Sequence, residues 1–169
     1  MRKILVFSDS HGNLTPLIEV LKKEKNYDTV FHLGDMEEDF NVLRRELDKI
    51  SPLAALLPVR GNCDTTAILP GVKTPEYEGQ RFFLTHGHIF MGGDLYSNLA
   101  RAAKAEGCGY VLFGHTHYPH DEMKNGVRLL NPGSISRPRQ TGHEPSYGVL
   151  EISDAGEVTW EQRFISVVY

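Results

Sequence analysis

The sequence predicts a mixed α/β fold, on the border of the α/β and α+β classes, in the form of a four-layer αββα sandwich of two mixed sheets flanked by helices. Up to about residue 70, short apolar runs alternate with helical patterns, as in parallel sheets. Beyond residue 70, turn signals such as Asn125-Gly126 and 154–156 indicate antiparallel hairpins. Both kinds of strand connection occur within 169 residues, which favours two packed sheets in one domain over residues 1–169.

The N-terminal part contains two β-loop-α units and a third strand. We expect, in order, a strand over 3–7, a helix over 14–21, a strand over 29–33, a helix over 40–50 and a strand over 53–59. Asn13 is the predicted N-cap of the first helix and Pro16 lies in its first turn. The second helix is expected to end near Pro52. Short buried strands that alternate with helices predict a largely parallel sheet.

The rest of the chain has a different pattern of connections. Strands are expected at about 72–77 and 81–85, joined through residues 78–80. A helix over 94–105 precedes a strand over 110–113. The tail is expected to form antiparallel strands around the two turn signals.

Composition and charge exclude several classes of function. The formal charge of −4 gives no basic field for long nucleic acid, and the one basic cluster, Arg137 with Arg139, is too short for a duplex-binding patch. No segment approaches the roughly 20 apolar residues that span a bilayer, so no membrane partner is expected. Cys63 and Cys108 cannot form a disulfide framework, which favours a reducing, cytoplasmic location.

Five predicted strands end in residue types that bind metal ions. The five segments are Asp9-Ser10-His11-Gly12, Gly34-Asp35, Gly61-Asn62-Cys63-Asp64, Thr85-His86-Gly87-His88 and Gly114-His115-Thr116-His117. Each segment contains or adjoins glycine, which lets the backbone turn sharply and approach a ligand. Ligand sites of α/β sheets form at the carboxyl ends of the strands, so these side chains can converge on one point.

The residue types also indicate the metal and the reaction. Carboxylates mixed with imidazoles and one amide suit Mn, Fe, Zn, Co or Ni. About seven candidate ligands exceed the needs of one four-coordinate ion, so we expect two ions, about 3.5 to 4 Å apart, that share a carboxylate. Such a pair can deprotonate a water and hold a phosphate ester. Asp9, Asp35 and a bridging hydroxide leave a charge of about +1, which matches a singly charged phosphodiester.

The order of these motifs, DSHG, GD, GN-x-D, GH and GHTH, resembles the calcineurin-like metallophosphoesterases, and the short length is similar to their compact YfcE-type phosphodiesterase branch. The resemblance extends to residues 130–134 and to Arg137-Pro138-Arg139 behind them. It implies the αββα sandwich and three groups of ligands, namely Asp9, His11 and His117 for a first ion, Asn62, His86 and His115 for a second, and Asp35 as the bridge. It also implies manganese as the activating ion, with Ni, Co, Zn, Fe or Mg as alternatives.

The expected function is therefore hydrolysis of small phosphodiesters by attack of metal-bound hydroxide, without a covalent intermediate. A phosphomonoesterase of the same fold is an alternative, and it predicts additional cations around the pocket. A non-catalytic protein-binding scaffold is a second alternative, because a retromer subunit shares this fold. Relatives are often dimers or larger, so a homo-oligomer is possible.

One position departs from the family pattern. Many members have histidine where this chain has Cys63, and that histidine is thought to protonate the leaving oxygen. The compact branch often carries the same cysteine, so the departure indicates a subfamily. Cys63 can be a small structural residue, a modest catalytic or metal-contacting group, or a redox-sensitive site. Asn62 and His88 are the candidate catalytic residues, with His88 the nearest candidate donor by sequence.

Several other residues are assigned on weaker patterns. Arg60, Ser134 and Arg137 are candidate phosphate contacts. His32 lies within a strand, so we expect it to be packed or hydrogen-bonded. Glu37, Glu38 and Asp39 are expected to lie in the first turn of a helix, where acids complement the helix dipole.

Overall fold

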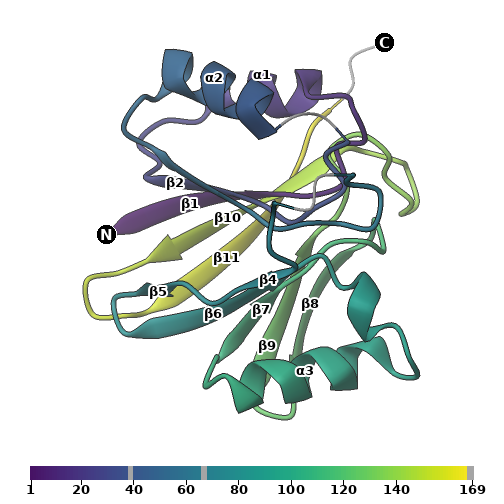
Figure 1. Cartoon of the computed structure of the whole chain (residues 1–169). Helices are drawn as coiled ribbons and strands as arrows, with labels where there is room; N and C mark the ends of the chain where they lie inside the picture. Colours follow the sequence, from purple (N-terminus) through teal and green to yellow (C-terminus); the bar gives the residue numbers. More distant parts are fainter. Residues whose placement is uncertain (38–39, 66–67, 167–169) are drawn as a thin grey trace.

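The computed structural model describes residues 1–37, 40–65 and 68–166. These residues form two mixed sheets that pack face to face, with α-helices on both outer faces (Figure 1). The predicted four-layer αββα sandwich is thus confirmed. No helix in the described ranges has the length and apolar character that crossing a membrane requires.

The first sheet has the strand order β11-β10-β1-β2-β3. Its strands are β1 (Arg2–Phe7), β2 (Thr29–His32), β3 (Ala55–Pro58), β10 (Ser146–Ile152) and β11 (Val158–Phe164). The three N-terminal strands run parallel to one another, whereas β10 is antiparallel to both β1 and β11. The parallel strands β1, β2 and β3 follow from the predicted β-loop-α units. The antiparallel pair β10 and β11 follows from the turn predicted at 154–156.

The second sheet has the order β4-β6-β7-β9-β8, with β5 paired to β6. Its strands are β4 (Val72–Lys73), β5 (Glu76–Tyr77), β6 (Gln80–Thr85), β7 (Tyr110–Leu112), β8 (Pro119–Lys124) and β9 (Val127–Pro132). Strands β6, β7 and β9 are parallel, and β8 forms the predicted hairpin with β9 across Asn125-Gly126. The second sheet therefore has parallel strands at its centre, whereas the parallel strands of the first sheet extend from its centre to the β3 edge.

The strand side chains alternate between two apolar layers. Ile4 and Val6 of β1 face the second sheet, where they meet residues such as Leu112. Leu5 and Phe7 point to the other face of the same strand. There they pack under α1 (Thr15–Lys23) and α2 (Phe40–Ile50).

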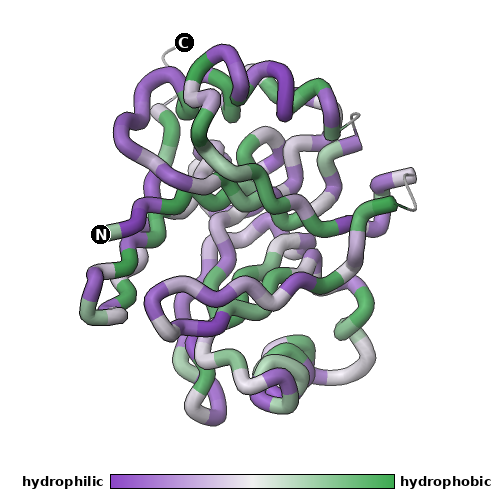
Figure 2. Tube along the Cα trace, turned by 60° about the vertical axis from the view of Figure 1, so that its left-hand side comes forward, coloured by the Kyte–Doolittle hydropathy of each residue, from purple (hydrophilic) through white to green (hydrophobic). Residues whose placement is uncertain are grey.

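The outer face of the second sheet is covered by α3 (Leu95–Ala105). Figure 2 shows the helices alternating between hydrophilic and hydrophobic segments, as expected when one helix face is buried. The three apolar layers fix the position of one sheet relative to the other. The candidate site at their common edge depends on this position, because its side chains come from both sheets.

Three local predictions need correction. Strand β3 begins at Ala55, because Leu53 lies in a turn and is 97% exposed. The strand expected over 72–77 is divided into β4 and β5 around Pro75, which has no N–H to donate. The N-cap of α1 is Leu14 and not Asn13, whose side chain instead accepts a hydrogen bond from Thr15 N at 3.3 Å.

A buried carboxylate ties the end of α1 to strands β1, β10 and β11 of the first sheet. Glu24 is 9% exposed and accepts hydrogen bonds from Lys3 Nζ at 2.8 Å, Tyr147 OH at 2.7 Å and Arg163 Nη1 at 2.5 Å. Burial raises the pKa of Glu24, but these three donors outweigh it and lower the pKa from 4.5 to about 2. The carboxylate is therefore stabilised in the folded chain relative to the unfolded one.

We expect Glu24→Gln to lower the free energy of unfolding by about 3 kcal/mol above pH 5. Because the folded pKa lies below the unfolded one, this contribution is complete above pH 4.5 and disappears as the pH falls towards 2. Denaturant titrations of both proteins across this range measure the difference. The control Glu19→Gln removes a carboxylate that is 66% exposed, and we expect a change below about 0.5 kcal/mol. A pH-independent difference for Glu24→Gln would contradict the assignment.

Candidate metal centre

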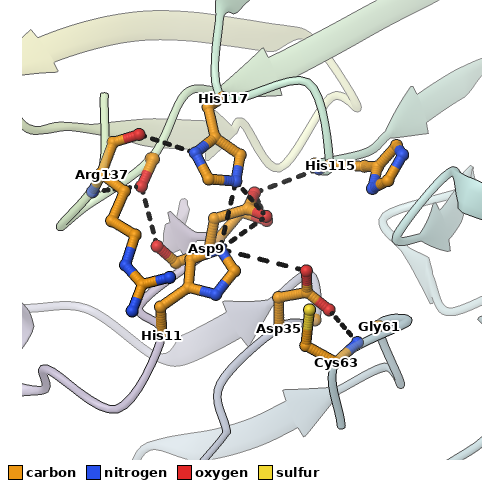
Figure 3. A network of polar contacts seen from close by, with 12 residues as sticks. Asp9, His11, Asp35, Gly61, Cys63, His115, His117 and Arg137 are labelled. Carbon is orange, nitrogen blue, oxygen red and sulfur yellow. Dashed lines mark hydrogen bonds and ion pairs between the residues drawn. The ribbon is translucent and has the colours of Figure 1, made fainter. Parts of the chain in front are cut away.

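The loops that follow the parallel strands of both sheets meet at one edge of the sandwich. Asp9 follows β1, and its backbone N–H donates to Gly34 O, in the loop after β2, at 3.0 Å. Asp9 also joins the sheets, because its Oδ2 accepts from the backbone N–H of His115, which follows β7, at 3.1 Å. The topology thus places residues from distant parts of the sequence at a single point (Figure 3).

Asp9, His11 and His117 form the first group of candidate ligands. His117 Nε2 lies 3.2 Å and His11 Nε2 lies 3.8 Å from Asp9 Oδ1. The two Nε2 atoms are 3.1 Å apart. Three donor atoms therefore surround a common point, and one ion could contact all of them.

Asp35, Asn62, His86 and His115 form the second group. His86 Nε2 is 3.2 Å from Asp35 Oδ2 and 3.1 Å from Asn62 Oδ1. A ring nitrogen of His115 lies within ligand distance of the same carboxylate and imidazole. Asp35 Oδ2 is also 4.0 Å from His11 Nε2, so this carboxylate lies between the two groups.

The hydrogen bonds of the imidazole Nδ1 atoms leave the Nε2 atoms available to bind a cation. His117 Nδ1 donates to Arg137 O at 2.6 Å and His86 Nδ1 donates to Leu33 O at 2.7 Å, because a carbonyl can only accept. His11 Nδ1 faces Glu37 Oε1 at 2.9 Å. In the neutral imidazoles the Nε2 atoms are then bare acceptors that face one another. A metal ion supplies the positive charge that such an arrangement lacks.

Asp9 gives the most direct test of fit to a metal. The residue is fully buried, and its Oδ2 accepts hydrogen bonds from Ser8 Oγ at 2.6 Å and from His115 N. Its Oδ1 is buried and accepts no hydrogen bond from the described residues. A buried carboxylate oxygen without a donor is costly, and a cation held by the surrounding nitrogens would satisfy it.

The backbone at the candidate ligands is strained. Asp9, His11, Asp35, His115 and His117 all have positive φ, between 44° and 67°. This region favours glycine, and each non-glycine residue held there costs of order 1 kcal/mol or more. The sandwich therefore holds these residues in an unfavourable conformation, which is typical of functional sites.

Two glycines allow the close approach of neighbouring loops. A Cβ atom on Gly61 would overlap the backbone N and the carboxylate of Asp35. A Cβ on Gly114 would overlap Ser8 Oγ and lie 2.8 Å from Asp9 Oδ2. Gly61 and Gly114 are thus required because the loops lie too close together for a Cβ atom at either position. The sequence indicated such a close approach.

The charges of the site are held by its hydrogen bonds. Burial raises the pKa of Asp9, but His117, His86 and the Ser8 hydroxyl together outweigh it, so the pKa lies below its ordinary value. The pKa of Asp35 is also lowered, since His86 outweighs burial. For Cys63, burial and the neighbouring Asp35 raise the pKa of the thiol to about 12. The site thus presents two carboxylates and, without metal, a protonated thiol.

Sequence reasoning assigned no role to Asp64 and only a helix-dipole role to Glu37. Asp64 accepts from the backbone N–H groups of Asp35, Met36, Glu37 and Gly61 at 2.7 to 2.9 Å, and so fixes the loop after β2 against the loop after β3. Glu37 instead precedes α2 and orients His11. Asp64 is the last residue of the third motif, so the motif could have indicated its role. Glu38 and Asp39, which were expected in the same helix turn as Glu37, lie outside the described residues.

The candidate substrate contacts have different outcomes. Ser134 is fully buried, its hydroxyl donates to Asp9 O at 2.7 Å, and it is not among the residues that line the cavity beside the cluster. Arg137 lines a cavity of about 280 Å³ together with the metal-ligand cluster, Cys63 and Arg139. Arg60 is not among the residues that line this cavity. The loop after β9 therefore contributes its arginines, and not its serine, to the open side of the site.

Two further histidines, His88 and His32, lie near the cluster but differ in their contacts. His88 begins a 3-10 helix, and its ring centroid is 5.5 Å from that of His86. Its Nδ1 is buried and has no hydrogen-bond partner among the described residues. His32 is fully buried between Ser10 Oγ at 3.0 Å and Gly34 N at 3.3 Å, which confirms the prediction of a hydrogen-bonded role. Burial lowers the pKa of His32 to about 4.

Comparison with known proteins yields a consistent set of relatives. The family model described as the calcineurin-like phosphoesterase superfamily domain matches residues 2–155. A probable metallophosphoesterase from Mycoplasma pneumoniae is 34% identical over 156 residues, which are 90% of this chain and 91% of that protein. The phosphodiesterase YfcE from Escherichia coli K12 is 31% identical over 170 aligned positions, with 89% and 88% covered.

Solved structures extend the comparison to the fold. A conserved uncharacterized protein from Streptococcus pneumoniae, described as a predicted phosphoesterase, superposes with a TM-score of 0.75 at 29% identity, covering 97% of this chain and 98% of that one. The Vps29 of Entamoeba histolytica, solved with Zn²⁺, gives a TM-score of 0.73 at 23% identity over 96% and 98% of the chains. At that identity the Vps29 comparison concerns the fold alone.

Proposed function

The chain belongs to the calcineurin-like phosphoesterase superfamily, and from this premise we propose that it hydrolyses small phosphodiesters with two bound divalent metal ions. The observation that carries the proposal is the bare Oδ1 of Asp9, which is buried among the Nε2 atoms of His11, His86 and His117. We further propose that residues 1–169 act as one domain with one such site.

The residues divide into two sets around the shared carboxylate. Asp9, His11 and His117 would hold one ion, and Asn62, His86 and His115 the other, with Asp35 contributing to both. When bound, the ions would lower the pKa of a water and stabilise charge on the phosphoryl oxygens. Manganese is the proposed activating ion, since mixed oxygen and imidazole ligands suit it, and a cytoplasmic location stays a prediction.

The chain's own side chains would position the substrate. Arg137 lines the cavity, where its guanidinium can donate two parallel hydrogen bonds to an anionic group of the substrate. Asn62 Oδ1 lies 3.1 Å from His86 Nε2, where both acceptors could contact one ion, and its Nδ2 donates to Cys63 Sγ at 3.3 Å. Arg60 contributes positive charge near His88 from outside the cavity.

The leaving oxygen needs a proton donor at the site. His88 lies beside His86 and His115, and its Nδ1 has no hydrogen-bond partner in the described part of the chain, so it is the proposed donor. Cys63 is exposed, and its backbone N–H donates to Asp35 Oδ1 at 2.8 Å. That contact supports a structural role for residue 63 in holding the shared carboxylate.

Two alternatives are distinguished by observations on this chain. A phosphomonoesterase needs further cations at the site, and Arg137 and Arg139 supply some. A protein-binding scaffold of the Vps29 type shares the fold, but such a role does not require all seven candidate ligands or their strained backbone. The relatives at 31 to 34% identity carry phosphodiesterase or metallophosphoesterase names, which supports hydrolysis.

Hydrolysis of bis(4-nitrophenyl) phosphate provides the test. We expect turnover by the purified chain with Mn²⁺, its loss after treatment with a chelator, and its recovery when Mn²⁺ is restored. A parallel series with 4-nitrophenyl phosphate distinguishes the monoesterase, which would give the higher kcat/KM on that substrate. Absence of turnover on both esters with Mn, Ni, Co, Zn and Mg would contradict the proposal.

A further inference from the structure

We propose that Arg137 and Arg139 form a subsite for a second anionic group of the substrate, one that does not react. This inference rests on the proposed function, because it assumes that a phosphate ester binds at the metal centre. It narrows the substrate class to phosphate esters that carry an additional phosphate or a comparable anion, such as nucleotides phosphorylated at two positions.

The loop that carries both arginines is built onto the metal centre. Ser136 Oγ donates to Asp9 O at 3.1 Å and to Ser10 O at 2.7 Å, and Ser134 Oγ donates to Asp9 O as well. His117 Nδ1 donates to Arg137 O at 2.6 Å, and Arg139 N donates to His117 O at 3.3 Å. The backbone positions of the arginines are therefore fixed relative to the ligands.

The guanidinium groups of Arg137 and Arg139 have no hydrogen-bond or ion-pair partner within residues 1–37, 40–65 and 68–166. Most arginines in the described ranges bond to a carboxylate, an amide or a carbonyl, namely Arg2, Arg44, Arg81, Arg101, Arg128 and Arg163. No carboxylate of the described residues lies within ion-pair distance of Arg137 or Arg139, although both line the cavity beside His11 and His117. Two unpaired guanidiniums on one cavity wall provide a binding surface for an anion.

The metal centre would have no excess negative charge to balance Arg137 and Arg139. Two dications are opposed by Asp9, Asp35, Glu37 and an attacking hydroxide, which brings the metal centre to a net charge of about zero. The arginines then add two positive charges at the open side of the cavity. A singly charged diester balances only one of them, whereas a further phosphate monoester adds about −1.5 to −2 at pH 7 and is sufficient to balance the other.

Paired substrates that differ by one phosphate test the subsite. The probes are the 4-nitrophenyl ester of thymidine 5′-phosphate and the same ester with a 3′-phosphate. With Mn²⁺ we expect the 3′-phosphate to raise kcat/KM about tenfold in the unmodified chain. Arg137→Gln with Arg139→Gln should bring the ratio of the two kcat/KM values close to one. Arg45→Gln, an exposed arginine on α2, should leave the ratio unchanged.

Binding without turnover separates this inference from the proposed function. By calorimetry, thymidine 3′,5′-bisphosphate should bind the Mn²⁺-loaded chain about tenfold more tightly than thymidine 5′-phosphate, and the double variant should lose this preference. That result supports the subsite even if neither ester is hydrolysed, in which case the proposed function alone fails. Equal affinities in the unmodified chain, or a preference that survives in the double variant, would overturn the subsite.

Discussion

Replacing Asp9 by asparagine is expected to lower kcat/KM on a phosphodiester by at least about 10³-fold. Asp9 Oδ2 accepts from Ser8 Oγ and His115 N, and only the oxygen of an amide can take over both bonds. The amide NH₂ group would then occupy the position of Oδ1, among the Nε2 atoms. A group that carries hydrogens cannot ligate an ion there and would repel it.

Metal content and activity should therefore fall together in Asp9→Asn. Titration with Mn²⁺ followed by calorimetry measures the number of ions bound, and hydrolysis of bis(4-nitrophenyl) phosphate measures kcat/KM. The control Asp121→Asn removes an exposed carboxylate that pairs with Arg128 at 2.8 Å, away from the metal-ligand candidates, and it should retain both properties. Activity of Asp9→Asn within tenfold of the unmodified chain would contradict the role of Asp9.

Gly61→Ala is expected to cause the largest loss of stability among conservative substitutions at the site. Its Cβ would lie 2.9 Å from Asp35 Cγ and overlap the Asp35 backbone N, and neither atom belongs to the far end of a flexible side chain. Relief of this overlap must move the loop after β2 away from the loop after β3, which Asp64 joins. We expect a decrease of about 2 to 3 kcal/mol in the free energy of unfolding.

The same displacement should weaken metal binding, because Asp35 is the carboxylate that we propose both ions share. Denaturant unfolding and Mn²⁺ titration of Gly61→Ala measure the two effects. Gly109→Ala is the matched control, since a Cβ at that position meets no atom within 4 Å and the backbone is not in the left-handed region. A Gly61→Ala protein as stable as Gly109→Ala would show that the close approach of the two loops is not required.

The sequence was sufficient to predict the layers of the fold. Buried strands that alternate with helical patterns predicted the parallel centre of the first sheet, and Asn125-Gly126 predicted the hairpin of β8 and β9. The boundaries were less predictable. Pro75 divides a strand because it lacks an N–H, and Leu53 is exposed although its apolar side chain favoured a strand.

For the site, residue types and strand ends predicted the cluster but not its geometry. The motifs placed Asp9 and His117 correctly at strand ends, yet their positive φ depends on tertiary contacts that no local pattern encodes. Ser134 lies in a motif-like loop, and its hydroxyl is directed inwards to Asp9 O. Whether a side chain in such a loop faces the core or the cavity is decided by packing, which sequence spacing alone does not give.

The central claim is that side chains from both sheets hold two metal ions at one edge of the sandwich. Anomalous diffraction from crystals of the chain grown with Mn²⁺ tests it most directly. We expect two peaks, one in contact with Asp9, His11 and His117, the other with Asn62, His86 and His115, and both with Asp35. A single peak, or peaks located away from these side chains, would contradict the account.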